Sequence, residues 1–413
     1  MRNKLIHRYY HSLRDQQYQY FIAEGKKVLE VECGVDIHSL NSRETFDYIV
    51  LPGTLGEVQD IQSFLVSLRK FCTPNTRIII EYYSYFWQYI LKLAEVLHLK
   101  RPQKIQNWIT AQDLINFLTL ADYEPIKKER SILLPINIWG VSYIVNRYVA
   151  KLPLINALTL NHFVIARPLY KEYKECSVTI LVPCRNERDN IEPAITRTPV
   201  FGTHQEFIFV EGHSQDGTYQ ELERVKVKYP QKDIKIFKQP GKGKGDAVRF
   251  GFNQASGDIL MILDADLTVA PEDLPKFYEA IRDHKGEFIN GSRLVYPMEK
   301  EAMRFLNLVA NKFFGIFFSW LLGQRFKDTL CGTKVLSRVH YQQIEANRAY
   351  FGDFDPFGDF DLIFGAIKQN LKVIELPIRY KSRQYGTTQI ERFRHGLLLL
   401  RMCAFAMKKI KFI

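Results

Sequence analysis

The sequence has 413 residues, 46% hydrophobic and 25% charged, which are the proportions of an ordinary soluble globular protein with about two or three domains. The formal charge of +12 favours anionic partners such as nucleotide phosphates or an acidic membrane surface. Because no familiar nucleic-acid module is visible, nucleic acid is not predicted as a partner. The six cysteines form no Cys-x-x-Cys pair, which argues against a zinc site or a disulfide framework and favours a reduced, cytoplasmic protein.

The first half of the chain alternates strand and helix patterns, which is typical of an α/β fold. A basic, tyrosine-rich helix opens the chain. Residues 131–160 are mostly apolar and contain two prolines, and they predict a helical hairpin that either bridges the two halves or touches a membrane. The charged run 171–175 predicts a linker, so we expect one domain at 1–170 and a second at 175–413. The predicted strands are 27–32, 46–52 and 77–81, and the predicted helices are 58–71, 85–99 and 110–121.

The strand and turn Val28-Leu29-Glu30-Val31-Glu32-Cys33-Gly34, with the strands that follow it, resemble the motifs of class I S-adenosylmethionine-dependent methyltransferases. The family has glycines at alternate positions here, so that the backbone approaches the cofactor. In this chain Glu32 and Asp36 take two of those places. Only nine residues separate Asp36 from Phe46, where the family has another strand, helix and strand. We therefore predict a truncated Rossmann-like, methyltransferase-like domain that is degenerate and serves packing or docking, with an active methyltransferase as the alternative.

The second half predicts strands at 177–183, 206–210, 234–237 and 259–263. The third of these leads into the loop Gly241-Lys242-Gly243-Lys244-Gly245-Asp246-Ala247, which opens a helix predicted at 248–254. Glycines permit close backbone approach, lysines supply positive charge, and a helix N-terminus favours an anion. The loop therefore predicts contact with a phosphate group.

Two carboxylates, Asp264 and Asp266, follow the apolar strand 259–263 directly. Five successive apolar residues are typical of a parallel strand that is covered on both faces. Ligands of open α/β sheets bind at the carboxyl ends of such strands. On an extended segment, residues two apart point the same way, so both carboxylates can share one divalent cation that neutralises a diphosphate. The sequence predicts a Mg²⁺ or Mn²⁺ site at Asp264 and Asp266.

These ordered motifs resemble the family 2 glycosyltransferases, and among them the polyprenyl-phosphate (dolichyl-phosphate mannose or glucose) synthases, over about residues 177–381. The resemblance implies a GT-A type nucleotide-sugar-binding domain with a UDP- or GDP-sugar donor. Carried over to this sequence, it assigns the metal to Asp264 and Asp266 and catalysis to Asp266, Arg383 and Asp359. It assigns the nucleotide-sugar to Pro183, Arg185, Glu187, Glu211, Lys244, Asp246, Asp264 and Arg293. The chain departs from the family at Gly212, which replaces a second acid, and at Thr388 and Gln389, which replace a Ser-Lys pair.

The resemblance also implies inversion at the anomeric carbon by direct displacement. A polyprenyl-phosphate acceptor is already anionic, so Arg293 and Arg383 would only align it, whereas a hydroxyl acceptor would need Asp359 or Asp361 as a base. The apolar segments 313–323 and 396–407 are too short to span a bilayer. They are typical of interfacial helices or of core or oligomer helices, and their basic flanks favour a peripheral position on the cytoplasmic face of a membrane. The alternatives are transfer to a glycan or another hydroxyl, and a non-catalytic scaffold. The sequence does not predict the oligomeric state.

Overall fold

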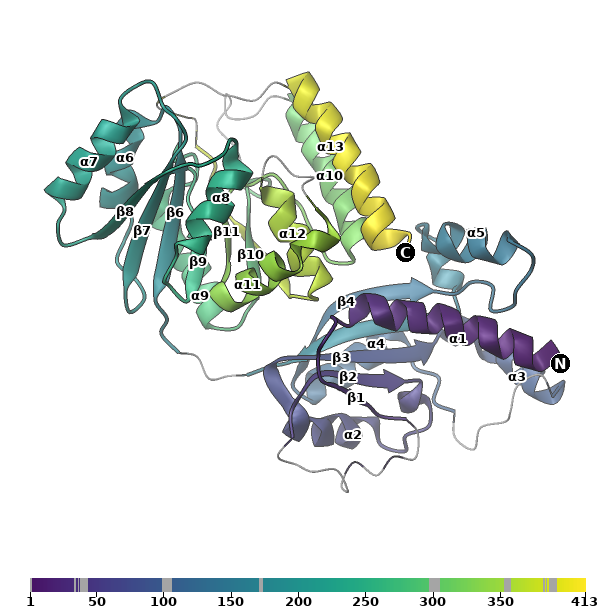
Figure 1. Cartoon of the computed structure of the whole chain (residues 1–413). Coiled ribbons are helices and arrows are strands. Elements are labelled where there is room, and N and C mark those ends of the chain that lie inside the picture. The colour runs from purple at the N-terminus through teal and green to yellow at the C-terminus, as the bar shows by residue number, and fades with distance from the viewer. Residues whose placement is uncertain are drawn as a thin grey trace. The chain divides into compact units, whose positions relative to one another are not determined.

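The computed structural model describes residues 2–32, 35, 37, 44–98, 106–170, 174–296, 305–352, 358–381, 383, 385 and 392–413. The chain separates into two compact units (Figure 1). Unit 1 comprises Met1–Tyr170 together with Lys408–Ile413, and unit 2 comprises Lys171–Met407. The last six residues, which the sequence placed at the end of the second domain, thus pack within unit 1.

Unit 1 is built on a five-stranded sheet with the order β1-β2-β3-β5-β4. The first three strands are parallel, and β5 runs antiparallel to both of its neighbours. β4 and β5 were not predicted, and in β4 a run of four charged residues at 127–130 conceals the strand. The strands are β1 (Val28–Glu30), β2 (Phe46–Pro52), β3 (Cys72–Tyr83), β4 (Tyr123–Ser131) and β5 (Asn161–Pro168).

Helices cover both faces of this sheet. Ile49, Leu51, Ile78 and Ile80 belong to a core cluster with residues of α2 and α4, while Phe21 of α1 packs on the opposite face. The hairpin predicted at 131–160 is wrong: this segment holds one helix of seven residues and two short 3-10 turns, and it is interrupted by prolines and by Gly140 with a φ of 70°. The helices of unit 1 are α1 (Arg2–Phe21), α2 (Ile61–Leu68), α3 (Gln88–Val96), α4 (Ala111–Leu120) and α5 (Val141–Arg147).

A buried ion cluster ties the last residues of the chain to unit 1. Lys411 Nζ lies 3.0 Å from Glu129 Oε1, and Lys151 Nζ lies 3.6 Å from the same oxygen. Burial alone would raise the pKa of Glu129, but the two lysines outweigh it and hold the pKa at about 2. This cluster therefore contributes stability above the usual carboxyl pKa of about 4.3, and the contribution is lost as pH falls toward 2.

We expect Lys411→Ala to destabilise unit 1 by about 3 kcal/mol at neutral pH, because it leaves a buried carboxylate short of one partner. Amide hydrogen exchange of β4 and β5 measures this effect without interference from unit 2. The difference from the wild-type protein should shrink as pH falls from about 4.3 toward 2. Lys408→Ala, at an exposed lysine three residues earlier, is the matched control and should change exchange little. Equal exchange in the two variants would contradict the prediction.

Unit 2 is built on a seven-stranded mixed sheet with the order β12-β10-β11-β9-β6-β7-β8. β9, β6, β7 and β8 are parallel, and β11 is inserted antiparallel between β9 and β10. The antiparallel strand β11 was not predicted. The strands are β6 (Val178–Cys184), β7 (Gln205–Glu211), β8 (Asp233–Lys238), β9 (Ile259–Ile262), β10 (Phe288–Ser292), β11 (Lys334–Ser337) and β12 (Val373–Pro377).

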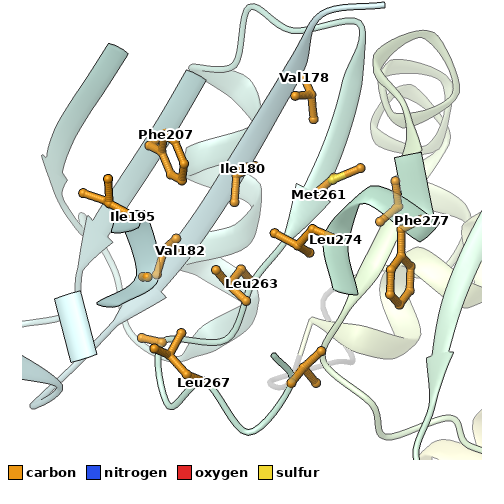
Figure 2. Close-up of a cluster of buried hydrophobic side chains, with 14 of the residues drawn as sticks. Val178, Ile180, Val182, Ile195, Phe207, Met261, Leu263, Leu267, Leu274 and Phe277 are labelled. Atoms are coloured by element: carbon orange, nitrogen blue, oxygen red, sulfur yellow. The ribbon is translucent and has the colours of Figure 1, made fainter. Parts of the chain in front are cut away.

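The core of unit 2 lies between the sheet and its helices. Figure 2 shows Val178, Ile180 and Val182 of β6 in one cluster with Met261 of β9 and with Leu274 and Phe277 of α9. Among the helices that the structure describes, none is both long and apolar enough to cross a membrane. The helices of unit 2 are α6 (Arg188–Thr196), α7 (Thr218–Lys228), α8 (Lys244–Asn253), α9 (Leu274–Arg282), α10 (Phe305–Leu322), α11 (Arg338–Ala346), α12 (Asp359–Lys368) and α13 (Arg392–Ala406).

Candidate active site

The carboxyl ends of two parallel strands, β9 and β7, bring acidic side chains to one edge of the unit 2 sheet. β9 ends at Ile262, so Asp264 and Asp266 lie just beyond it, as predicted. The extended geometry expected for the pair is wrong, because the amide of Leu267 donates to the carbonyl of Asp264 and closes a tight turn. At the same edge, β7 ends with Glu211.

Asp264 forms an ion pair with the lysine that opens α8. Lys244 Nζ lies 2.7 Å from Asp264 Oδ1 and 3.8 Å from Oδ1 of Asp359, which is the first residue of α12. Burial alone would lower the pKa of Lys244, but the two carboxylates outweigh it and the pKa lies above its usual value. Because α8 begins at Lys244, four residues earlier than predicted, this lysine belongs to the first helical turn.

The N-termini of α8 and α12 meet through two glycines. A Cβ on Gly358 would lie 2.5 Å from the Cα of Gly245, so only glycine permits this approach. Asp246 accepts hydrogen bonds from Gln239 Nε2 and from the amide of Gly241, both at 2.9 Å. In the structure Asp246 thus holds the Gly/Lys loop, and two helix N-termini, which favour negative charge, face the same region.

Gly332 packs directly against the ion pair of Asp264 and Lys244. A Cβ at this position would lie 1.8 Å from Asp264 Oδ2 and 2.5 Å from Lys244 Nζ. The next lysine, Lys334, donates to Asp359 Oδ1 at 2.9 Å and to the carbonyl of Cys331. No residue of the loop 328–334 was among the predicted site residues, yet this loop forms one wall beside Asp264.

Arg383 connects Asp266 with Glu187. Its Nη2 lies 2.8 Å from Asp266 Oδ2, and its Nη1 lies 2.8 Å from Glu187 Oε1. The second oxygen of Asp266 accepts hydrogen bonds from the amide (3.1 Å) and the hydroxyl (2.8 Å) of Thr268, which fixes the carboxylate. Burial is the main cause that raises the pKa of Glu187, and Arg383 opposes it. Thr268 was not a predicted site residue; an Asp two residues before a threonine is the signal that indicates such a turn.

Arg293 is engaged inside the protein. Its Nε and Nη2 lie 2.6 and 2.8 Å from the two oxygens of Asp328, and its guanidinium lies 5.1 Å from the centre of the Tyr380 ring. Burial alone would raise the pKa of Asp328, but the paired guanidinium outweighs it and the pKa lies below its usual range. The structure therefore shows Arg293 holding the loop 328–334 in place.

The remaining predicted residues lie near the ends of β6 and β7. Pro183 is half-buried within β6, and the Arg185 side chain is exposed just beyond it. Glu211 is buried and accepts a hydrogen bond from the amide of Ser214. Gly212, which replaces the second acid, packs closely here, since a Cβ on it would lie 3.0 Å from Gln239 Oε1. Thr388 and Gln389 lie outside the described residues.

The oxygen atoms of Asp264 and Asp266 fit a hard divalent cation in their chemistry. The described residues contain no group of three or more acidic, histidine or cysteine side chains that could hold a metal ion. A bound ion would therefore need oxygen atoms from a diphosphate and from water as well. Lys244 and Arg383 occupy one oxygen of each carboxylate, and both are long side chains that can rotate away.

Comparison with known proteins identifies this half of the chain. The family described as Glycosyl transferase family 2 matches residues 179–341. Unit 2 carries a family 2 glycosyltransferase domain. Together with the mixed sheet, the match confirms a GT-A-like α/β fold for this glycosyltransferase domain.

Relatives of the glycosyltransferase domain include dolichol-phosphate mannosyltransferase from Pyrococcus furiosus, 30% identical over 54% of this chain and 64% of that protein. Polyprenol monophosphomannose synthase from Mycolicibacterium smegmatis is 24% identical over 51% of this chain and 80% of its own length. The crystal structure of glucosyl-3-phosphoglycerate synthase from Mycobacterium tuberculosis, with Mn²⁺ and UDP, is 17% identical with a TM-score of 0.41, covering 57% of this chain and 80% of that one. The chain thus spans less than two thirds of the P. furiosus relative.

Proposed function

We propose that the protein transfers a sugar, with inversion, from a UDP- or GDP-sugar to a polyprenyl-phosphate-type lipid acceptor at the cytoplasmic face of a membrane. The observation that carries the proposal is the convergence of Asp264, Asp266, Lys244 and Arg383 at the carboxyl edge of the glycosyltransferase sheet. The names of the two sequence relatives support a polyprenyl-phosphate acceptor.

In this proposal Asp264 and Asp266 hold Mg²⁺ or Mn²⁺ against the donor diphosphate. The ion would act as a Lewis acid for the departing nucleoside diphosphate. Lys244, released from Asp264, pairs with the diphosphate at the N-terminus of α8, where Asp246 keeps the loop in place. Pro183, Arg185, Glu187 and Glu211 contact the nucleoside, and Arg383 aligns the acceptor phosphate through its forked donors. Arg293 acts by positioning the loop 328–334.

The ion pairs of the two candidate bases favour a phosphate acceptor over a hydroxyl. Asp359 Oδ1 already accepts from Lys334, and Lys244 lies 3.8 Å away. Asp361 Oδ2 lies 3.0 Å from Arg348 Nε and 3.6 Å from Arg249 Nη1. A hydroxyl proton would have to compete with these cations for either carboxylate, whereas an acceptor phosphate arrives ionised and needs no base.

For unit 1 we propose a truncated methyltransferase-like fold without a nucleoside site. In the sheet, the parallel strands β1, β2 and β3 are followed by the antiparallel β5, which lies between β3 and β4. This arrangement supports an α/β ancestry of this kind. Cys33, Gly34 and Asp36, which carried much of the resemblance, lie outside the described residues. Helix α1 supplies the cover of one sheet face that a shortened chain would otherwise lack.

Thermal unfolding with nucleotide-sugars tests the donor and metal parts of the proposal. A UDP- or GDP-sugar with Mn²⁺ should raise the melting temperature by about 5 °C at a hundredfold excess over Kd, and neither component alone should do so. Transfer of label from the same donor into an organic-solvent phase would identify a lipid product. No shift with any nucleotide-sugar, with either ion, would overturn the proposal, and label that appears only in water-soluble product would favour the hydroxyl acceptor.

A further inference from the structure

Helix α3 of unit 1 turns its apolar side chains toward solvent. Within the described residues of unit 1, no residue of α3 is buried. Its exposed large apolar residues, with the one that follows it, are Tyr89, Ile90, Leu93, Val96 and Leu97. At 100° per residue they fall within about one third of the helix circumference. A helix that packs on its own core has this apolar stripe on the inside, so the stripe of α3 is arranged for an external apolar partner.

Helix α5 also turns apolar side chains toward solvent, and in addition its inward face is polar. Its buried residues are Ser142 and Asn146, whereas Val141, Tyr143 and Ile144 are exposed. Asn146 Oδ1 accepts the amides of residues 133 and 134 at 2.8 and 2.9 Å, and its Nδ2 donates to the carbonyl of residue 134. The Ser142 hydroxyl likewise accepts the amide of residue 138 and donates to the carbonyl of residue 136. The inward polar face thus satisfies the backbone of the preceding loop.

Two further apolar side chains are exposed without any packing that would explain their position. Trp139 is 98% exposed directly before the left-handed Gly140. Leu154 is 88% exposed and has a φ of 72°, a conformation that is unfavourable for a leucine. Backbone strain of this kind indicates a functional role when no contact inside the protein compensates for it.

The two segments belong to one surface of unit 1. Trp87 Nε1 donates to the carbonyl of Leu158 at 2.8 Å, and the amide of Ser84 donates to the carbonyl of Leu160 at 2.8 Å. We call residues 85–97 and 136–158 the docking surface. Residues 136–158 contain no acidic residue, and the basic side chain that remains accessible there is Arg147, since Lys151 is buried against Glu129. Lys411 is taken up by the same carboxylate, and Lys408 and Lys409 are the further basic residues of 408–413.

We propose that the docking surface lies in the interface of a lipid bilayer with anionic headgroups. Backbone groups in an apolar medium need partners within the protein, which is what Ser142 and Asn146 provide. Tryptophan and tyrosine favour the membrane–water boundary, and basic residues complement anionic headgroups. The inference adds to the proposed function the part of the chain that meets the membrane, and it depends on that function only for its biological purpose.

Co-sedimentation of the full chain with vesicles tests this without any sugar transfer. The probe is phosphatidylcholine vesicles with or without phosphatidylglycerol, at low and high salt. We expect binding that phosphatidylglycerol strengthens and salt weakens. Trp139→Glu with Leu154→Asp should lower the partition coefficient about tenfold or more, because apolar contact is lost and charge is placed in the interface. The conservative pair Trp139→Phe with Leu154→Met should bind nearly as the wild-type protein.

The matched control is Val200→Glu with Val227→Asp, two valines of unit 2 that are each 81% exposed. This pair, and the transfer-deficient Asp264→Asn, should sediment as the wild-type protein, so a failed vesicle test is separable from a failed enzymatic proposal. The proposal is overturned if the wild-type protein binds none of the vesicles, or if the double variants of unit 1 and unit 2 sediment alike. Light scattering that shows an oligomer dissolved by Trp139→Glu with Leu154→Asp would overturn it in favour of a second copy of the chain.

Discussion

Asp264→Asn is expected to reduce the rate of sugar transfer about 100- to 1000-fold at saturating donor and Mn²⁺. The substitution keeps the shape of the side chain but removes the charge that holds Lys244 now and would hold a cation when donor is bound. An amide oxygen is a weaker ligand for a hard cation than a carboxylate. Initial rates of nucleoside diphosphate release, measured at fixed acceptor, give the effect directly.

Asp233→Asn is the control for this experiment, because Asp233 opens β8, at the opposite end of the strands from the site. It should transfer sugar at nearly the wild-type rate. Both variants should melt within a few degrees of the wild-type protein, which separates lost chemistry from lost folding. Transfer by Asp264→Asn within about tenfold of wild type would contradict a metal-bound diphosphate at this position.

Gly332→Ala is expected to lower transfer about 100-fold or more through one added methyl group. Its Cβ would lie 1.8 Å from Asp264 Oδ2, so the carboxylate must leave its present position. The atoms that it meets are the ends of two flexible side chains rather than backbone, and Gly332 is not in the left-handed region, so the fold should tolerate the change. A displaced Asp264 can no longer share a ligand with Asp266, and a misplacement of about 1 Å is enough for this loss.

Gly56→Ala, in unit 1, is the matched substitution, because its Cβ would meet only the end of Gln106 at 3.3 Å. Transfer by Gly56→Ala should equal that of wild type. Donor titration by thermal unfolding should show weakened metal-dependent binding for Gly332→Ala and unchanged binding for the control. Wild-type binding and transfer by Gly332→Ala would mean that the loop 328–334 moves away from Asp264 in the working enzyme.

The sequence predicts the parallel part of the unit 2 sheet well, since its strands are short apolar runs that end in polar turns. Asp264 and the Gly/Lys loop could be located because each follows a strand whose end is marked by composition. The antiparallel β11 could not be predicted, because four residues between two helices carry too little periodicity. In unit 1 the strand β4 was hidden by the charged run 127–130, of which Glu129 is paired with Lys411 from a distant segment.

Sequence reasoning cannot predict which charged side chains pair with one another across the site. Arg383 meets Asp266 and Glu187 from 117 and 196 residues away, and no local pattern encodes those distances. For the same reason Arg293, assigned to phosphate by resemblance, lies instead against Asp328. Residue types could be predicted, but the choice of partner among several nearby opposite charges depends on the folded backbone.

The placement of residues 408–413 in unit 1 has a consequence for how the protein is made. Unit 2 is synthesised between Tyr170 and Lys408, so the ribosome must complete it before Glu129 can meet Lys411. At ordinary elongation rates this leaves the nascent unit 1 incomplete for roughly 10 to 50 seconds. Unit 1, which is translated first, therefore completes its fold last. Its apolar helices emerge while residues 408–413 have yet to leave the exit tunnel.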